Sequence, residues 1–314
     1  MIYGVITFFM VIILLFLLIH MAPGDPARVL AGEYVASEEY LQLIRKEFGL
    51  DKPIYEQLII YVLKVIRGDL GFSYRFGRPI VEMIFAFLPA TLLLMGTSLA
   101  FSGIAGALLG VISAKPHGTM MARLMELATG LSLAAYSLPA FWVGMLLLLI
   151  LGLNLRLFPT FGIVRPGVAG INWMFDILHH LTLPTLTLSL SHLAMYFRLT
   201  RASMVESLSK EYITTAKAKG LDENTVFYKH ALRNSILPLV TMIGMQLSTM
   251  VGGTVTIEAI FSWPGLGKLT FDAIQARDYP VVLGTFIFLS ASVIVTTILI
   301  DALYVKLNPR IRYR

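Results

Sequence analysis

The chain has 314 residues, of which 57% are hydrophobic and only 14% are charged, and its mean hydropathy is +0.77. Soluble globular domains are about 45–50% apolar and about 25% charged, so these values exclude an ordinary soluble protein and predict a membrane protein. The chain lacks cysteine, which excludes a disulfide framework and thiolate metal sites. The net charge of +6 fits basic cytoplasmic loops and does not by itself indicate nucleic-acid binding.

Six segments are apolar over the roughly 20 residues that a helix needs to cross a bilayer. In chain order they are residues 2–19, 81–114, 124–153, 181–199, 236–257 and 281–304. The first lacks the basic start of a signal peptide, and Ala22-Pro23-Gly24-Asp25-Pro26 follows it in place of a cleavage site, so we expect an uncleaved span. The expected fold class is an all-α membrane protein with six transmembrane helices.

Residues 21–80, between the first two spans, form a loop too long for a simple connector. Ser37 is a candidate N-cap for an amphipathic helix, which Gly49 ends before Pro53 starts the next. The second helix is expected over 54–66, with Leu58, Tyr61, Val62 and Val65 on one face. Two compatible interpretations are open: a small cap packed on the span ends, or a docking surface for an extracytoplasmic partner.

Two features of the spans concern contacts. Gly103, Gly106 and Gly110 give the second span a stripe of small residues, which favours close helix contact within the subunit or with a partner. His179 and His180 could suggest a metal site, but no further ligands accompany them, which favours a pair at the membrane interface.

Residues 203–238, which we call the polar hairpin, are the one long polar stretch in the second half of the chain. A helix is expected over 200–219, with Gly220 at the position where glycine ends helices. Asp222 is a candidate N-cap for a second helix that runs to about Arg233, and Pro238 lies at the entry to the fifth span. Lys210 and Lys217 lie on one face of the first helix, and either the positive-inside rule or a docking partner explains them.

Lysine and arginine predict the orientation of the spans, because short cytoplasmic loops are enriched in both. One side of the predicted bundle collects thirteen of them, in the 115–123 connection, in residues 198–233 and in the C-terminal tail. The two short loops on the other side hold four, which are Arg156, Arg165, Lys268 and Arg277. We therefore expect both termini and the polar hairpin to be cytoplasmic.

The polar hairpin resembles the cytoplasmic coupling loop, or EAA loop, of permease subunits in ATP-binding-cassette (ABC) importers. The residues that carry the resemblance are Glu211, Tyr212, Ala216, Lys217, Ala218, Lys219, Gly220, His230, Ala231, Leu232, Arg233 and Asn234. Further matches follow in order at 22–26, 48–53, 68–73, 88–91, 137–141 and 258–267. Together they are similar to the dipeptide/oligopeptide/nickel permease family, in the branch of its B-type subunits.

Two positions depart from the generic coupling-loop pattern. Thr214-Thr215-Ala216 stands in the Glu-Ala-Ala slot, and Arg233 stands where other permeases carry proline. Both departures are expected of the B-type branch. They put in doubt any acid-specific contact taken over from other importers.

The resemblance implies a type I ABC importer permease fold. It divides the chain into a first transmembrane helix (1–20), an extracytoplasmic helical loop (21–80) and a five-helix core (81–314) that contains the coupling loop 200–235. The implied partners are a homologous C-type permease, two ATPase subunits that bind ATP and magnesium, an extracytoplasmic solute-binding protein and the lipid bilayer. This chain itself would bind no cofactor, metal or nucleic acid, and the pathway would carry peptides or a related small solute such as a nickel chelate or an oligosaccharide.

Two other functions compete with this one. An ion-coupled secondary transporter needs ionisable residues inside the spans, whereas Glu82, His192 and Asp301 lie near span ends. A membrane-embedded enzyme needs a polar catalytic cluster, and the sequence shows none. The sequence also has no Walker A motif, because Ser262 stands where the first glycine would precede Gly267-Lys268. The energy for an importer must therefore come from another chain.

Overall fold

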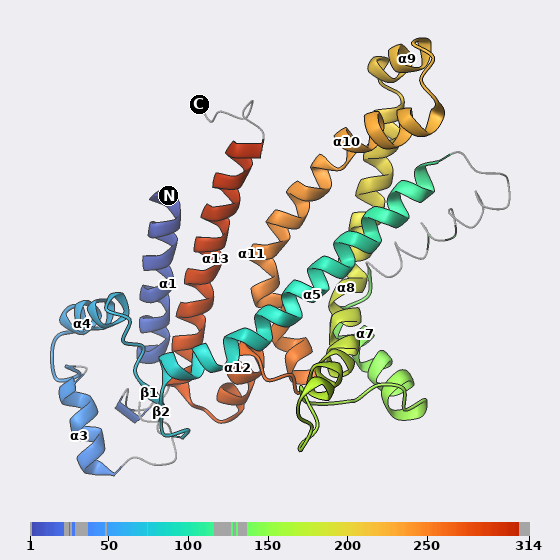
Figure 1. Cartoon of the computed structure of the whole chain (residues 1–314). Helices are drawn as coiled ribbons and strands as arrows, with labels where there is room; N and C mark the ends of the chain where they lie inside the picture. Colours follow the sequence, from blue (N-terminus) through green and yellow to red (C-terminus); the bar gives the residue numbers. More distant parts are fainter. Residues whose placement is uncertain are drawn as a thin grey trace. The chain divides into compact units, whose positions relative to one another are not determined.

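The computed structural model describes residues 2–21, 25, 27–28, 37–47, 49–73, 75–115, 127, 130 and 137–307 (Figure 1). This part is mostly helical, with one short antiparallel pair in which β1 (Phe72–Ser73) adjoins β2 (Arg78–Pro79). The helices are α1 (Ile2–Met21), α3 (Glu38–Glu47), α4 (Ile54–Ile66), α5 (Ile80–Ala114), α7 (Ala140–Leu147), η1 (Leu148–Asn154), α8 (Ile171–Leu208), α9 (Glu211–Ala218), η2 (Thr225–Ala231), α10 (Leu232–Ser235), α11 (Leu237–Ile260), α12 (Leu266–Gln275) and α13 (Tyr279–Leu307).

Five of the six predicted apolar segments lie in long helices, namely α1, α5, α8, α11 and α13. The prediction for α8 was too short at both ends, since residues 181–199 are the middle of a 38-residue helix. The placement of His192 near a span end was therefore wrong, because it lies well inside α8. Within the described residues, α5 and Tyr279–Ile300 of α13 are long and apolar enough to cross a membrane, and shorter apolar helices cover Gly4–Leu18 and Ala140–Asn154. Six crossings and cytoplasmic termini therefore stay predictions.

The predicted third span is not one continuous α-helix in its described part. Pro139 is extended, with φ −60° and ψ 131°, and α7 begins directly after it. Proline disfavours helical conformation in the residue before it, which explains the break at Leu138. The chain then widens into the π-helix η1, a change that the apolar sequence does not indicate. Residues 124–136 lie outside the described residues, apart from Leu127 and Gly130.

The chain forms two compact units: residues 1–92, 251–259 and 264–314 in the first, and residues 93–250 and 260–263 in the second. In the first unit, α1 packs against α13 and α4. Their shared core consists of Ile12, Leu15, Ala27, Leu41, Ile44, Val65, Leu283 and Ile287. The division into a first helix, an outer loop and a five-helix core stays a prediction.

The helices expected after the first span are confirmed. The backbone N–H of Tyr40 donates to Ser37 Oγ (3.3 Å), so Ser37 caps α3, and Gly49 takes the left-handed conformation (φ +61°). α4 has the predicted bounds, and Val65 on its predicted face is buried. Sequence analysis missed Gln57, whose buried side chain donates from Nε2 to the carbonyl of Lys52 (2.8 Å).

A buried carboxylate fixes the start of α12 in the same unit. Glu258, with no exposed surface, accepts hydrogen bonds from Thr91 Oγ1 (2.8 Å), from the N–H of Gly267 (2.7 Å) and from the N–H of Lys268 (3.1 Å). A Cβ on Gly265 would lie 2.4 Å from Glu258 Oε2, so no larger residue fits there without a shift. The glycines near Lys268 thus make room for a helix cap, which accounts for their likeness to a phosphate-binding loop.

In the second unit, α5 packs closely against α8. A Cβ on Gly106 would lie 2.7 Å from Tyr196 Cβ, and one on Gly110 would lie 2.6 Å from Thr200 Cβ. On Gly103 it would lie 2.9 Å from Ile243 in α11. The predicted glycine stripe is confirmed as a contact within the subunit, because only glycine lets these helices approach so closely.

Candidate functional site

The polar hairpin begins in the last turns of α8, beyond the α5 contact (Figure 1). Ser209 Oγ donates to the carbonyl of Glu206 (2.8 Å), and Lys210 takes an extended conformation, with ψ 151°, ahead of α9. Serine that bonds to a nearby carbonyl competes with the helical hydrogen bonds. The single helix expected over 200–219 is therefore wrong: α8 and α9 are separate, and Lys210 lies between them.

Gly220 ends α9 as predicted. Its φ is +77°, its N–H donates to the carbonyl of Lys217 (2.9 Å), and the N–H of Leu221 donates to the carbonyl of Ala216 (3.4 Å). These two bonds form a Schellman motif, which requires the left-handed conformation that glycine adopts at little cost. The turn direction after α9 is thus set by one residue.

Asp222 begins the return of the chain, also as predicted. Its Oδ2 accepts a hydrogen bond from the N–H of Thr225 (2.9 Å). The pKa of Asp222 lies below its usual value, mainly because the side chain of Thr225 donates a hydrogen bond to the carboxylate and, to a smaller extent, because the backbone N–H of Thr225 does so too. The carboxylate is therefore charged at neutral pH and caps the helical segment that follows.

The second helical segment ends close to Arg233, as expected, but it begins as a π-helix, which the sequence does not indicate. The chain runs as π-helix η2, continues as α10 through Ser235 and enters α11 at Leu237, with Pro238 in the first turn. Proline is tolerated there, because the first N–H groups of a helix have no partner within it. The return arm of the hairpin thus leads almost without interruption into α11.

The hairpin has a hydrophobic core of its own, which joins it to α5 and α8. The buried residues of this core are Val111, Met204, Ile213, Ala216, Val226, Phe227 and Ala231. Ser235 Oγ donates to Met204 Sδ (2.7 Å), and Ile213 and Ala231 are at most 1% exposed. The hairpin is therefore a packed body and not a loose connection between helices.

The structure separates the predicted site residues into two groups. Those that support the hairpin from within are Ala216, which is buried, and Tyr212, His230 and Leu232, which are half-buried. Those that are exposed are Glu211, Lys217, Ala218, Lys219, Gly220, Arg233 and Asn234. The amide of Asn234 turns back to the carbonyl of His230 (3.4 Å). Within this set, Lys217, Lys219 and Arg233 are the exposed cations.

Two features of this site have no signal in the sequence. Lys115, at the end of α5, donates to Asn224 Oδ1 (3.3 Å) and lies 5.6 Å from the ring centre of Tyr228, which ties α5 to the hairpin. Leu221 and Tyr228 are large apolar residues that are 40% and 50% exposed, next to the basic residues. Their spacing carries no motif, so only the fold brings them to this surface.

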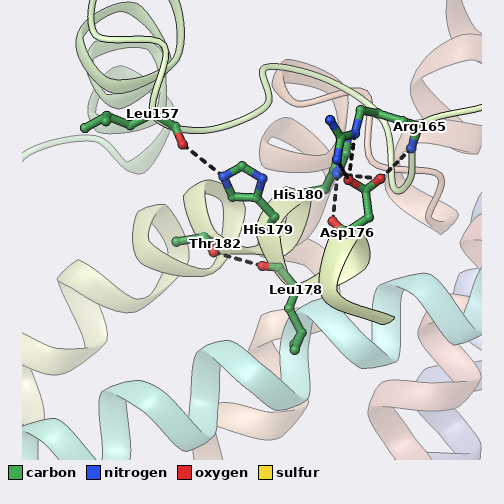
Figure 2. Close-up of polar contacts among 7 residues, drawn as sticks. All are labelled: Leu157, Arg165, Asp176, Leu178, His179, His180 and Thr182. Carbon is green, nitrogen blue, oxygen red and sulfur yellow. Dashed lines mark hydrogen bonds and ion pairs between the residues drawn. The ribbon is translucent and has the colours of Figure 1, made fainter. Parts of the chain in front are cut away.

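The other end of α8 is fixed to the preceding loop, residues 155–170 (Figure 2). The buried carboxylate of Asp176 accepts from the N–H of Arg165 (2.7 Å) and from its Nε (2.7 Å). His179 Nε2 lies 2.9 Å from the carbonyl of Leu157, and His180 Nδ1 lies 2.8 Å from that of Asp176. The two histidines thus bind the chain itself, and no cluster suited to a metal occurs in the described ranges.

Comparison with known proteins assigns the chain to a family. Residues 106–313 match the model of the binding-protein-dependent transport system inner membrane component, and residues 1–95 match the model of the N-terminal part of such components. The chain belongs to this family. The polar hairpin lies inside the larger match, as the resemblance to importer permeases requires.

Similar proteins of known role cover almost the whole chain. The glutathione transport system permease protein GsiC of Escherichia coli O6:H1 is 39% identical over 98% of this chain and 95% of its own length. The dipeptide transport system permease protein DppB of Escherichia coli K12 is 38% identical over 98% of this chain and 96% of its own. The predicted resemblance to the dipeptide/oligopeptide permeases is confirmed.

This membrane component is a permease subunit of an ABC importer in the cell's inner membrane. A binding-protein-dependent permease works with a solute-binding protein and an ATPase, so partners of both kinds are expected for this one. The family assignment supports this function over an ion-coupled secondary transporter.

Proposed function

We propose that this permease carries short peptides and that its exposed hairpin receives the movement of an ATPase subunit. The cargo is supported by the names of the two relatives above, which specify glutathione and dipeptide. Neither name mentions nickel, so we do not extend the proposal to nickel chelates.

The proposed assembly pairs this permease with a homologous C-type permease around a shared pathway. Two ATPase subunits bind ATP and magnesium on the cytoplasmic side, and a solute-binding protein delivers cargo outside. This chain is a translocation subunit and not an enzyme, since it has no Walker A motif. Its six apolar segments cross the bilayer with both termini in the cytoplasm, a topology supported by the distribution of lysine and arginine.

The observation that carries the coupling role is the packed hairpin core. Because Ile213, Phe227 and Met204 pack together, a push on α9 moves α8 with it and is not absorbed by a flexible loop. The exposed Lys217 and Lys219, next to the apolar Leu221, provide the surface on which an ATPase subunit docks. Closing of the ATPase pair on ATP then favours one state of the pathway, and hydrolysis restores the other.

Charge reversal on the docking surface tests this role. The variant Lys217→Glu/Lys219→Glu is placed in the complete complex in liposomes, with the solute-binding protein and a dipeptide supplied outside. We expect ATP hydrolysis to continue while peptide uptake falls about tenfold, since two ion pairs at an interface turn into repulsions. The charge-preserving Lys217→Arg/Lys219→Arg is the control and keeps most of the uptake.

Normal coupled uptake in the charge-reversed complex would remove the hairpin from the mechanism. Uptake by this chain alone, without an ATPase subunit, would instead overturn the importer assembly.

A further inference from the structure

One face of α8, where the hairpin begins, has a hollow of about 510 Å³. Among the residues that the structure describes, Arg198, Arg201, Ala202, Val205 and Glu206 line it. They are spaced at three, four, seven and eight residues from Arg198, so they share one face of the helix. The opposite face, with Phe197, Thr200 and Met204, is buried. The hollow therefore faces away from the core of its own unit.

The charge in this hollow is not balanced within the described part of the chain. Glu206 is engaged by Lys210, whose Nζ lies 2.9 Å from Glu206 Oε1, whereas neither Arg198 nor Arg201 forms an ion pair there. Arg201 Nε is shielded from solvent and has no hydrogen-bond acceptor among the described residues. A partly desolvated cation without a counter-charge is costly, which favours an anionic ligand.

The chemistry of the guanidinium group narrows the class of ligand. Two arginines one helical turn apart present planar forks of N–H donors, which match carboxylate and phosphate oxygens in pairs. A carboxylate of a soluble ligand and the phosphate of a lipid headgroup share this chemistry.

The surface of α8 distinguishes between these two sources. A phospholipid needs apolar surface beside the headgroup site, along which its acyl chains lie. Between Leu178 and Val205, the large apolar side chains of α8 are buried, as are Leu181, Leu183 and Phe197, or only half-buried, and Val205 is the one large apolar side chain in the hollow that is exposed. The exposed apolar surface beside the two arginines is therefore small, which suits a small soluble anion better than the acyl chains of a lipid.

We propose that Arg198 and Arg201 bind the C-terminal carboxylate of a short peptide as it passes the cytoplasmic end of the pathway. This inference rests on the proposed peptide cargo and adds a binding site within the permease itself. The hollow has room for a dipeptide, and its two arginines bind a feature that all linear peptides share, whatever their side chains. The site would hold the cargo by its backbone.

The test compares a dipeptide with its C-terminal amide. The complete complex, with its solute-binding protein, is supplied with Ala-Ala or with Ala-Ala amide, and uptake is measured for wild type and for Arg198→Gln/Arg201→Gln. Because every complex uses the same binding protein, a change in the ratio of acid to amide uptake reports on the permease. We expect this ratio to fall about tenfold, as for the loss of one charge-assisted hydrogen bond.

Two control variants accompany it. Arg198→Lys/Arg201→Lys keeps the charge but loses the paired donors, so its ratio should be intermediate. Arg75→Gln/Arg78→Gln removes two exposed arginines elsewhere in the chain and should keep the wild-type ratio.

Binding to the complex without its binding protein gives a second readout, by saturation-transfer NMR with Ala-Ala as the probe. We expect binding to wild type, weaker binding of the amide, and loss of Ala-Ala binding in the Gln variant. An unchanged acid-to-amide ratio together with unchanged Ala-Ala binding would overturn the inference and leave the importer function standing. Displacement of Ala-Ala by phosphatidylglycerol but not by inorganic phosphate would overturn it in favour of a lipid. Absence of any peptide uptake by the wild-type complex would instead contradict the proposed cargo.

Discussion

Gly220 shows how one residue can determine the shape of the proposed coupling surface. Its φ of +77° redirects the chain after α9, and a Cβ placed on it would meet no atom within 4 Å. The requirement for glycine is therefore one of backbone conformation and not of space. Substitutions here change the local geometry of the hairpin without a clash in its core.

We predict that Gly220→Val uncouples ATP hydrolysis from peptide uptake. Valine in the left-handed conformation costs roughly 1–2 kcal/mol, enough to shift the turn that presents Lys217 and Lys219. Uptake per ATP hydrolysed, measured in liposomes, should fall several-fold. Gly220→Asn is the matched control, because asparagine tolerates this conformation, and it should retain most of the coupling. Equal coupling in both variants would show that the turn is not needed.

We predict that the local stability of the hairpin depends on pH through Asp222. Hydrogen bonds from Thr225 lower the pKa of Asp222, so its contribution to stability is present above the ordinary carboxyl pKa of about 4 and is lost as pH falls through the lowered value. Hydrogen exchange at the amide of Thr225 should therefore increase in acid beyond the intrinsic change.

The variant Asp222→Asn separates this effect from general acid damage. Asparagine caps helices about as well as aspartate but does not titrate in this range, so the amide of Thr225 should stay protected. The same acid sensitivity in both proteins would exclude the carboxylate as its cause.

At the scale of elements, the sequence predicts where helices occur better than where they are interrupted. Capping residues with local partners, such as Ser37 and Gly220, were identified correctly because the hydrogen bonds of these caps join residues at most five positions apart. The sequence did not predict the helix breaks at Ser209–Lys210 and in the described part of the third apolar segment. The break after α8 coincides with the bond from Ser209 to the carbonyl of Glu206, but serine forms such bonds inside helices too, so the sequence alone does not predict the break.

The candidate site was predicted in the same uneven way. The resemblance singled out the hairpin as the candidate site, but it did not distinguish the buried Ala216 from the exposed Lys217, its neighbour. The contact of Lys115 with Asn224 joins residues 109 positions apart. The arginine pair on α8 entered the sequence analysis only as part of a charge count. What made it a candidate site was the burial of the opposite helix face, a tertiary property.

We predict that the close contact between α5 and α8 contributes to the stability of the permease. Gly110→Val should destabilise the permease by about 1–3 kcal/mol, because its side chain would overlap Thr200 and the carbonyl of Phe197, 2.6 Å and 2.9 Å from a Cβ. Unfolding of the detergent-solubilised chain by heat or denaturant measures the loss. Gly96→Ala in the same helix is the control, since a Cβ there meets nothing within 4 Å. Equal stability of the two variants would mean that α5 and α8 do not pack this closely in solution.

For the whole molecule, the topology can be tested on an unusually clean background, because the chain has no cysteine. Single cysteines at Glu39, Ala169 and Glu223 occupy three exposed positions in the outer segment, in the loop before α8 and in the hairpin. In intact cells, a membrane-impermeant maleimide should label the first two, and label the third only after permeabilisation, as the lysine and arginine distribution predicts.

Labelling at these three positions also tests which segments cross the bilayer. Glu39 and Ala169 lie on the same side only if α5 and the apolar segment 124–153 both cross the bilayer or both fail to. We expect both segments to cross. α5 has 35 residues and is strongly apolar, and the described part of the segment 124–153 is a short α-helix followed by a π-helix, also apolar. Ala169 and Glu223 are separated by α8 alone, so opposite accessibility requires that α8 cross. Labelling of Ala169 and Glu223 from the same side would contradict this topology and would place the hairpin out of reach of a cytoplasmic ATPase.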